Sequence, residues 1–531
     1  MRFTKSTVVM AAAAAVLLGL SACAAGGDTT DEASSDILIF AGGEPDHLTP
    51  GRQTVAFDQV QSVFSPLVDL DADGNTSFLA AESVDSDDAT TWTIKLRDGW
   101  TFHNGDPVTA QTYVDAWNYV AYGPNAWENS WELASIVGYT DLNPAEGEPT
   151  TKEMSGLKVV DDLTFTVELV GPDSQFPLQL TTAQTAFYPM PESAYDDIEA
   201  YDRKPIGNGP FEMTEAWEDT KEYTVTAYED YAGPEPTVAG ITFRPYTDSL
   251  TGYTDVLAGN ADLLYLPAAK MTSAVADFGE DHVYSLEAPG VDYIGFPLWD
   301  EKWQNKELRQ AISMAIDRES INTAIYGGLY APANSLSSPN MNGDPAGICD
   351  ELCSYDPEAA KAMLEKAGGF EGTMSIVYPG GSGLDELFEA YANQIRQNLG
   401  IDAVATPTTD WAEYWQSLVD HTVAGPHFGH WGALYPSQQS TLRALFTEGG
   451  GCYVCTGFSS DEVDKMLVEA DASQTLDDSY EGYADVQKVV LDAFPTVPTF
   501  SNTYNYVTSE RVKDLPAVSG SPVLSKIVLG D

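Results

Sequence analysis

Four of the five cysteines in this 531-residue chain form two close pairs, a spacing that suits disulfides or a metal site. Cys349 lies four residues before Cys353, and Cys452 lies three residues before Cys455. Four cysteines allow three pairings, and two local disulfides, Cys349–Cys353 and Cys452–Cys455, are the simplest of them. A zinc site from the same four thiols is the rival interpretation, although Cys-x3-Cys is a poor spacing for a zinc ribbon. A redox role for the second pair is disfavoured, because no thioredoxin-like strand and helix surround it.

The fifth cysteine, Cys23, ends the first apolar run of the chain. Arg2 and Lys5 precede the apolar residues 7–20, which are too few to span a bilayer and are typical of an export signal. Leu-Ser-Ala-Cys at 20–23 resembles a bacterial lipobox, which implies cleavage after residue 22 and lipidation of Cys23. The alternative is an ordinary signal peptide cut at a small residue. Residues 23–36 are otherwise small and polar, so we expect a flexible tether at the outer face of the cell membrane.

Two histidines in His427-Phe428-Gly429-His430 invite a metal interpretation. Three-residue spacing suits a helix face, but this segment is predicted to be a strand that runs into a loop, so packed or cleft-lining histidines are favoured. Signatures of enzymes are missing from the sequence, which contains no Gly-x-Ser-x-Gly, Walker loop or His-Glu-x-x-His. We therefore expect no catalytic residue, no cofactor and no metal. A secreted hydrolase with an unrecognised carboxylate pair is the remaining enzyme hypothesis.

The charge balance excludes one class of partner. Acidic residues outnumber basic ones by 81 to 25, and the formal net charge is −56 at pH 7. Binding to nucleic acid requires basic patches, so we expect no nucleic-acid partner, and direct attraction to anionic lipid is disfavoured too. Because the acidic residues are spread along the chain, a solvated surface is favoured over a preference for cationic ligands.

Helices and strands follow each other along the chain without a fixed-period repeat. Apolar residues spaced i, i+3, i+4, i+7 and i+8 from Leu308 predict a helix, and Asp356-Pro357 begins another. A helix is also predicted over 385–399, ended by Gly400 and followed by a strand over 401–405. Further strands are predicted over 37–40, 91–97 and 100–102. This mixture and the length predict an α/β protein with two lobes.

Several segments, in their order along the chain, resemble the large extracytoplasmic solute-binding proteins of the peptide and nickel class. These proteins, solute-binding family 5, are the oligopeptide- and dipeptide-binding components of ABC importers. The resemblance covers roughly residues 37–520. The matching segments are 96–99, 102–110, 205–211, 257–262, 308–318, 355–368, 400–401 and 456–458.

The resemblance implies a two-lobed, periplasmic-binding-protein-like α/β fold of type II. Lobe I is expected over 37–292 and 501–531, with an extra subdomain at about 57–185, and lobe II over 293–500. The lobes of such proteins close on a ligand. The implied partners are a small peptide or peptide-like ligand and the permease subunits of an ABC importer, whose ATPase is a separate subunit. We expect a monomer that reaches the membrane through its lipid anchor.

The segment Trp431-Gly432-Ala433-Leu434-Tyr435-Pro436 matches the family segment that faces the ligand. In many peptide-binding relatives it is Trp-x-Ala-Asp-Tyr-Pro, and the Asp pairs with the α-ammonium of the peptide. Leu434 replaces that Asp, and a buried ammonium without a carboxylate is costly. Three explanations are open: another acid such as Glu44 or Glu413 substitutes, the amino end lies elsewhere, or the ligand is a sugar, a modified peptide or a siderophore-like molecule.

Aromatic residues are dense around the expected cleft. Aromatic rings suit varied side chains and also stack on sugar faces, so an oligosaccharide is the alternative ligand. About half of these rings are expected to belong to the core instead. A surface sensor or adhesin that uses the same fold is a further alternative. The predicted ligand-binding residues are Glu44, Trp127, Trp131, Trp411, Trp431, Leu434, Tyr435, Tyr504 and Tyr506.

Overall fold

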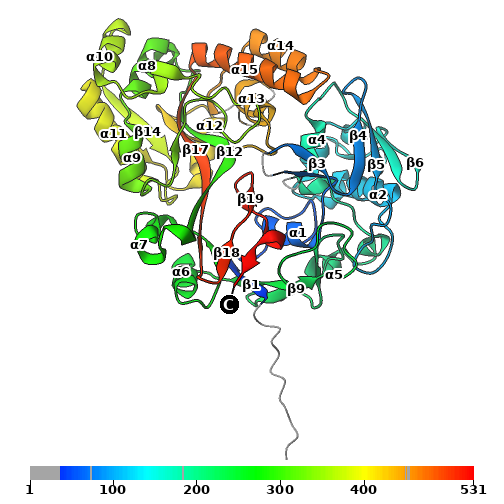
Figure 1. Ribbon diagram of the computed structural model, residues 1–531. Coiled ribbons are helices and arrows are strands. Elements are labelled where there is room, and N and C mark those ends of the chain that lie inside the picture. Colours follow the sequence, from blue (N-terminus) through cyan, green and yellow to red (C-terminus); the bar gives the residue numbers. More distant parts are fainter. Residues whose placement is uncertain are drawn as a thin grey trace, which may run out of the picture. The chain divides into compact units, whose positions relative to one another are not determined.

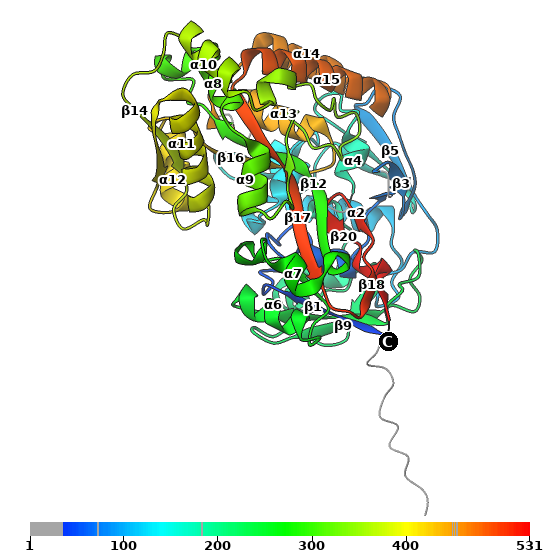
Figure 2. The same ribbon diagram turned by 60° about the vertical axis from the view of Figure 1, so that its left-hand side comes forward.

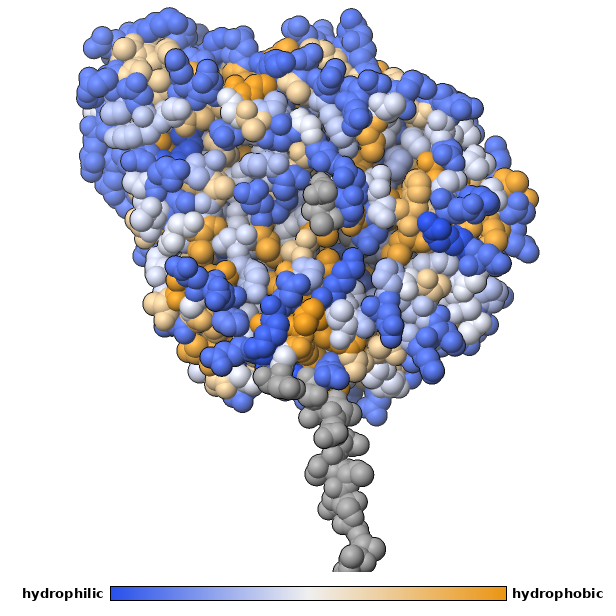
Figure 3. Space-filling view, viewed as in Figure 1, coloured by the Kyte–Doolittle hydropathy of each residue, from blue (hydrophilic) through white to orange (hydrophobic). Residues whose placement is uncertain are grey.

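The computed structural model describes residues 36–71, 74–181, 184–448, 450, 452 and 455–530. Cys23, the expected signal peptide and nearly all of the expected tether lie outside these residues. Among the described helices, none is long and apolar enough to cross a membrane. Hydrophilic side chains cover much of the face seen in Figure 3, in agreement with the excess of acidic residues.

A large mixed sheet runs through the described part of the chain (Figure 1). Its hydrogen-bonded order is β15-β14-β16-β12-β17-β11-β1-β10-β9-β8, and β13 (Ala331–Pro332) pairs with β17 beside this path. The strands in that order are β15 (Asp402–Pro407), β14 (Thr373–Tyr378), β16 (His427–Gly432), β12 (Val283–Gly295), β17 (Thr496–Thr508), β11 (Leu263–Tyr265), β1 (Ile37–Gly42), β10 (Gly240–Pro245), β9 (Tyr223–Ala227) and β8 (Phe211–Met213).

Two 13-residue strands, β12 and β17, connect the two halves of this sheet, and Figure 2 shows them running side by side. They are antiparallel, from Val283 opposite Val507 to Gly295 opposite Thr496. Their register shifts at Pro289-Gly290, where Gly290 has a φ of 142° and a Cβ would lie 2.2 Å from the Trp431 carbonyl oxygen. Only glycine fits this close approach of three strands.

The first hydrophobic core collects buried residues from Leu38 to Leu263 together with residues between Tyr506 and Ile527 near the end of the chain. It includes a separate four-stranded sheet, β4-β5-β7-β6, covered by α2 (Ala110–Ala121). Thr109 caps α2 through a reciprocal hydrogen bond with Thr112. The other elements here are α1 (Phe57–Val63), β2 (Val68–Leu70), β3 (Thr76–Phe78), β4 (Ala81–Asp85), β5 (Thr91–Leu96), α3 (Tyr139–Leu142), β6 (Leu157–Asp161), β7 (Thr164–Glu168), α4 (Phe176–Gln179), α5 (Ile198–Arg203), α6 (Ser249–Leu257), α7 (Ala274–Phe278), β18 (Val512–Asp514), β19 (Ala517–Val518), β20 (Ser521–Pro522) and β21 (Val528–Leu529).

The second core collects buried residues from Val291 to Phe500 and is mostly helical. Polar side chains cap its helices, for example Asp356 on α10 and Ser460 on α14. Disulfides join Cys349 to Cys353 and Cys452 to Cys455, with Cα separations of 5.5 and 5.2 Å. The helices are α8 (Lys306–Met314), α9 (Arg318–Ile325), α10 (Pro357–Lys366), α11 (Asp385–Leu399), α12 (Trp411–Val419), α13 (Gln438–Phe446), α14 (Asp461–Asp471) and α15 (Leu476–Ala493).

A buried polar contact joins the segment before α4 to the helices α13 and α15. Gln175 is fully buried; its Oε1 accepts from Ser437 Oγ at 2.6 Å and its Nε2 donates to Ser479 Oγ at 2.8 Å. Beside it, Gln439 Nε2 donates to Asp173 at 2.9 Å and to Asp471 at 2.7 Å. We call this set the Gln175 contact. It links the region of the expected extra subdomain directly to the second core.

Candidate functional site

A cavity of about 710 Å³ lies beside the paired strands β12 and β17. Its walls come from both sides of that pair. Tyr265 and Met271 come from the part of the chain before β12, whereas residues 382–387 and Phe428 come from the part between β12 and β17. The volume falls in the range of small-molecule and peptide sites. Because residues from both sides of β12 and β17 form its walls, the volume of this cavity changes when the two sides move relative to each other.

Asp292 and His430 form a polar pair in this cavity. They are directly opposite each other on the antiparallel strands β12 and β16, so their side chains share one face of the sheet. His430 Nδ1 lies 2.6 Å from Asp292 Oδ1. Burial disfavours the imidazolium, but the hydrogen bond and the negative charge of Asp292 outweigh it, and the pKa of His430 is raised above 6.5.

Four tyrosines, Tyr265, Tyr326, Tyr330 and Tyr504, line the same cavity and are called the tyrosine box below. The rings of Tyr326 and Tyr330 stack at 4.2 Å, and those of Tyr265 and Tyr504 meet edge to face at 6.1 Å. Burial, with a contribution from the charge of Asp292, raises the pKa of all four hydroxyls, that of Tyr265 to about 12. The box is therefore neutral at physiological pH and lines the same cavity as the carboxylate of Asp292.

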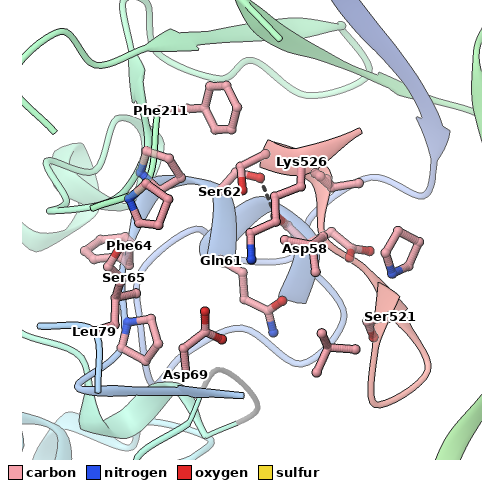
Figure 4. Close-up of a pocket in the computed structure, with 18 of the residues that line it drawn as sticks. Asp58, Gln61, Ser62, Phe64, Ser65, Asp69, Leu79, Phe211, Ser521 and Lys526 are labelled. Carbon is pink, nitrogen blue, oxygen red and sulfur yellow. Dashed lines mark hydrogen bonds between the residues drawn. The ribbon is translucent and has the colours of Figure 1, made fainter. Parts of the chain in front are cut away.

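A smaller cavity of about 120 Å³ lies between α1 and the turn that carries Lys526 (Figure 4). Asp58, Asp69 and Lys526 line it, and burial raises the pKa of Asp58 to about 6. Its volume admits a few water molecules and not a peptide. This volume excludes the smaller cavity as a peptide site. A third cavity, of about 740 Å³, is lined only by residues between 102 and 195, whereas the cavity beside β12 and β17 is lined from both sides of that pair and is therefore the candidate site.

Comparison with known proteins identifies the family. The family model of bacterial extracellular solute-binding proteins, family 5 (middle part), matches residues 76–451. The chain is a family 5 solute-binding protein. Among its relatives, the oligopeptide-binding protein OppA of Bacillus subtilis is 25% identical over 491 residues, which cover 88% of each chain. The dipeptide-binding protein DppE of the same organism is 24% identical over 493 residues, covering 89% of this chain and 88% of DppE.

Solved structures of similar proteins share the fold of this family 5 protein. The unliganded open form of the murein tripeptide-binding protein MppA has a TM-score of 0.81 at 21% identity and covers 94% of this chain and 98% of its own. Haemophilus influenzae OppA in complex with RPPGFSPFR has a TM-score of 0.69 at 20% identity, covering 93% and 99%. The family resemblance and the two-lobed α/β fold expected from the sequence are confirmed.

The predicted ligand-facing segment of this family 5 protein lies beside the cavity on another face of β16. Trp431 alternates with Phe428 and His430 along the strand, and its partly buried ring packs on the second core. The backbone N–H of Leu434 donates to Ser440 Oγ at 2.8 Å. The Leu434 side chain and the buried Tyr435 pack against the apolar cluster that contains Leu70 and Leu178 of the first part of the chain.

The remaining predicted residues are distributed around the molecule. Tyr504 lines the cavity, and Tyr506 is buried against the first core with its ring 5.5 Å from that of Tyr265. Trp411 is 59% exposed on α12, and its ring lies 5.8 Å from that of Phe428. Trp127 is buried in the first core and Trp131 is half exposed. Glu44 lines a separate pocket, where it accepts from the Thr220 backbone N–H at 2.6 Å.

Sequence reasoning missed Asp292 and three members of the tyrosine box, Tyr265, Tyr326 and Tyr330. They come from three distant segments, and no local pattern connects them. His427 and His430 were considered as metal ligands. His427 is fully buried with its ring nitrogens 3.0 and 2.5 Å from the carbonyl oxygens of Gly425 and Cys455, and the described residues hold no group of three or more potential metal ligands.

Proposed function

We propose that this chain is the substrate-binding lipoprotein of an ABC importer, which captures peptides or peptide-like solutes and delivers them to a membrane permease. The observation that carries the proposal is the cavity lined from both sides of β12 and β17 in a member of a solute-binding family. OppA and DppE are named for oligopeptides and dipeptides. A relative from Brucella ovis, 26% identical over 340 residues, is named a putative ABC transporter peptide-binding protein.

Capture works by differential affinity. Lobe I comprises 37–292 and 501–531, with its extra subdomain at about 57–185, and lobe II comprises 293–500. A ligand that contacts walls from both lobes binds the closed arrangement more tightly and so favours closure. The protein binds its solute without converting it, and ATP is hydrolysed by a separate subunit of the importer.

Delivery depends on the amino-terminal segment. Lipidated Cys23 anchors the protein to the outer face of the cell membrane through the short polar segment that follows it. The anchor keeps a monomeric binder near its permease and raises its local concentration there. Metabolic labelling with a radioactive fatty acid tests this part: we expect label in the wild type and none in Cys23→Ala.

Binding is tested by titration calorimetry of the segment from residue 36 onward with di- to pentapeptides. We expect binding without turnover, and the variant Tyr504→Ala, in the cavity wall, loses at least tenfold in affinity. Tyr355→Ala is the matched control, because Tyr355 is exposed and remote from the cavity walls. Equal affinity in both variants would contradict the site, and appearance of cleaved peptide would favour the hydrolase hypothesis.

A further inference from the structure

The chemistry of the candidate cavity selects among peptide-like ligands. We propose that the tyrosine box and Asp292 form a subsite for an organic cation, the ammonium or guanidinium group of the ligand. This inference rests on the proposed function and names the class of solute that the site prefers. It is argued from the geometry of the rings, from the charges in the walls and from the residue at position 434.

The rings form the walls that such a cation requires. Ammonium and guanidinium groups are attracted to the faces of aromatic rings, and a carboxylate in the same cavity adds a Coulombic attraction. Tyr326 and Tyr330 stack on one side of the cavity, whereas Tyr265 and Tyr504 meet on another. Asp292 lies close enough to all four for its charge to act on their hydroxyls.

These tyrosines are not simply core residues. Tyr265 is 44% exposed, and the other three are only partly buried. Their hydroxyls donate no hydrogen bond to any residue in the described part of the chain and, unlike the unpartnered hydroxyls of the buried Tyr113 and Tyr293, they belong to side chains that reach the cavity. Four rings with uncommitted hydroxyls around one cavity are therefore available to a ligand.

The charged side chains that line the cavity are mostly acidic. Three carboxylates, Asp292, Asp385 and Glu386, line the cavity, and His430 is the single basic side chain among the described residues that line it. His430 already pairs with Asp292, so an incoming cation replaces or joins this imidazole at the carboxylate. An anionic ligand would meet uncompensated carboxylates here, which disfavours it.

Position 434 fits the same conclusion. The sequence places Leu434 where many peptide-binding relatives have the Asp that pairs with an ammonium, and Leu434 packs in an apolar cluster. Asp292 supplies a carboxylate in the cavity, on a neighbouring strand of the same sheet. Among the explanations that the sequence leaves open, the structure favours a cationic group bound at another carboxylate.

Titration calorimetry with three tripeptides, Ala-Lys-Ala, Ala-Gln-Ala and Ala-Glu-Ala, and with choline tests the inference. We expect Ala-Lys-Ala to bind at least tenfold more tightly than Ala-Glu-Ala. Asp292→Asn, which preserves shape and an acceptor for His430, weakens Ala-Lys-Ala at least tenfold. Glu386→Gln, at an exposed position, gives a smaller loss and provides a second test if Asp292→Asn does not fold. Asp485→Asn, which removes an exposed carboxylate on α15, is the matched control and leaves affinity unchanged.

The outcomes separate the inference from the proposed function. The three peptides could bind equally in the wild type and all bind more weakly to Asp292→Asn. This result places the α-ammonium of the peptide in the tyrosine box and supports the inference. Equal binding that Asp292→Asn and Glu386→Gln leave unchanged overturns the inference and leaves the peptide function standing. Binding of choline without any peptide supports the cation subsite and overturns the peptide function. No binding by any of the four ligands overturns both.

Discussion

The Gln175 contact makes one quantitative prediction, because it is the buried polar link between the region of the expected extra subdomain and the helices of the second core. Gln175→Leu keeps the volume and removes both hydrogen-bonding atoms. The lost hydrogen bonds to the second core are those to Ser437 Oγ, at 2.6 Å, and to Ser479 Oγ, at 2.8 Å; the bond to the neighbouring Ser174 Oγ, at 3.1 Å, is local and does not join the two parts. The side chain is fully buried, so no water replaces the amide without rearrangement.

The free energy lost in Gln175→Leu depends on the hydrogen bonds that the hydroxyls of Ser437 and Ser479 keep. Ser437 Oγ still accepts from the Gln439 backbone N–H, and Ser479 Oγ still donates to the Leu476 carbonyl. Neither becomes wholly unsatisfied, so each lost bond costs about 1 kcal/mol, a net hydrogen bond, and the contact loses about 2 kcal/mol in all. That free energy corresponds to a roughly 30-fold larger open population of the contact.

Amide hydrogen exchange measures this population directly, because protected amides exchange in proportion to local opening. We expect segments 173–181 and 437–446 to exchange roughly 30-fold faster in Gln175→Leu. Gln111→Leu is the matched control: the same substitution at an exposed position of α2, where the Gln111 side chain donates to Asp115, changes neither segment. Protection in 437–446 within threefold of the wild type would refute the reasoning and show that the apolar cluster around Tyr435 carries the contact alone.

Three further predictions concern the site and the second core. Leu434→Asp places a carboxylate beside Leu70 and Leu178, so we expect a loss of about 1–3 kcal/mol in unfolding free energy, measured by urea denaturation; an unchanged unfolding free energy would contradict the packing of this side chain in the apolar cluster. Because His430 has a raised pKa, its pairing with Asp292 stabilises the fold below about pH 6.5 and loses this effect as pH rises through the pKa of His430. Protonated His430 competes with a cationic ligand for Asp292, so affinity for Ala-Lys-Ala falls on acidification from about pH 8 to 5.5, and His430→Gln flattens the profile; a flat wild-type profile is the contrary result. Arg318 is 4% exposed and donates to the carbonyls of Pro498 and Cys353, both at 2.9 Å, so Arg318→Met lowers the urea-derived unfolding free energy by about 3–5 kcal/mol; a loss under about 1 kcal/mol would contradict this account.

Local signals predicted the helices well. The helix expected over 385–399 is α11, and Gly400 ends it with a φ of 69°. Asp356 caps α10 by accepting from the N–H groups of Glu358 and Ala359, as its position before a proline indicates. Capping and apolar spacing act within a few residues, so a sequence carries them completely.

Strands and the site were harder to predict, because both depend on distant pairing. The strand expected over 100–102 is a single bridge, Thr101 with Pro107, because the turn at Asn104-Gly105 returns the chain at once. The segment at His427, expected to run into a loop, continues as β16 to Gly432. The pairing of Asp292 with His430 requires the register of β12 and β16, residues 138 apart in the chain, and no local pattern contains it.

Strand β17 has a consequence for the order of folding. Its residues Val497 and Phe500 complete the second core, whereas Tyr506 belongs to the first, and residues up to Ile527 finish that first core. The first core, which begins at Leu38, is therefore complete only when the residues up to Ile527 have been synthesised. A carboxy-terminal truncation therefore removes buried residues from the core that the amino-terminal half of the chain builds.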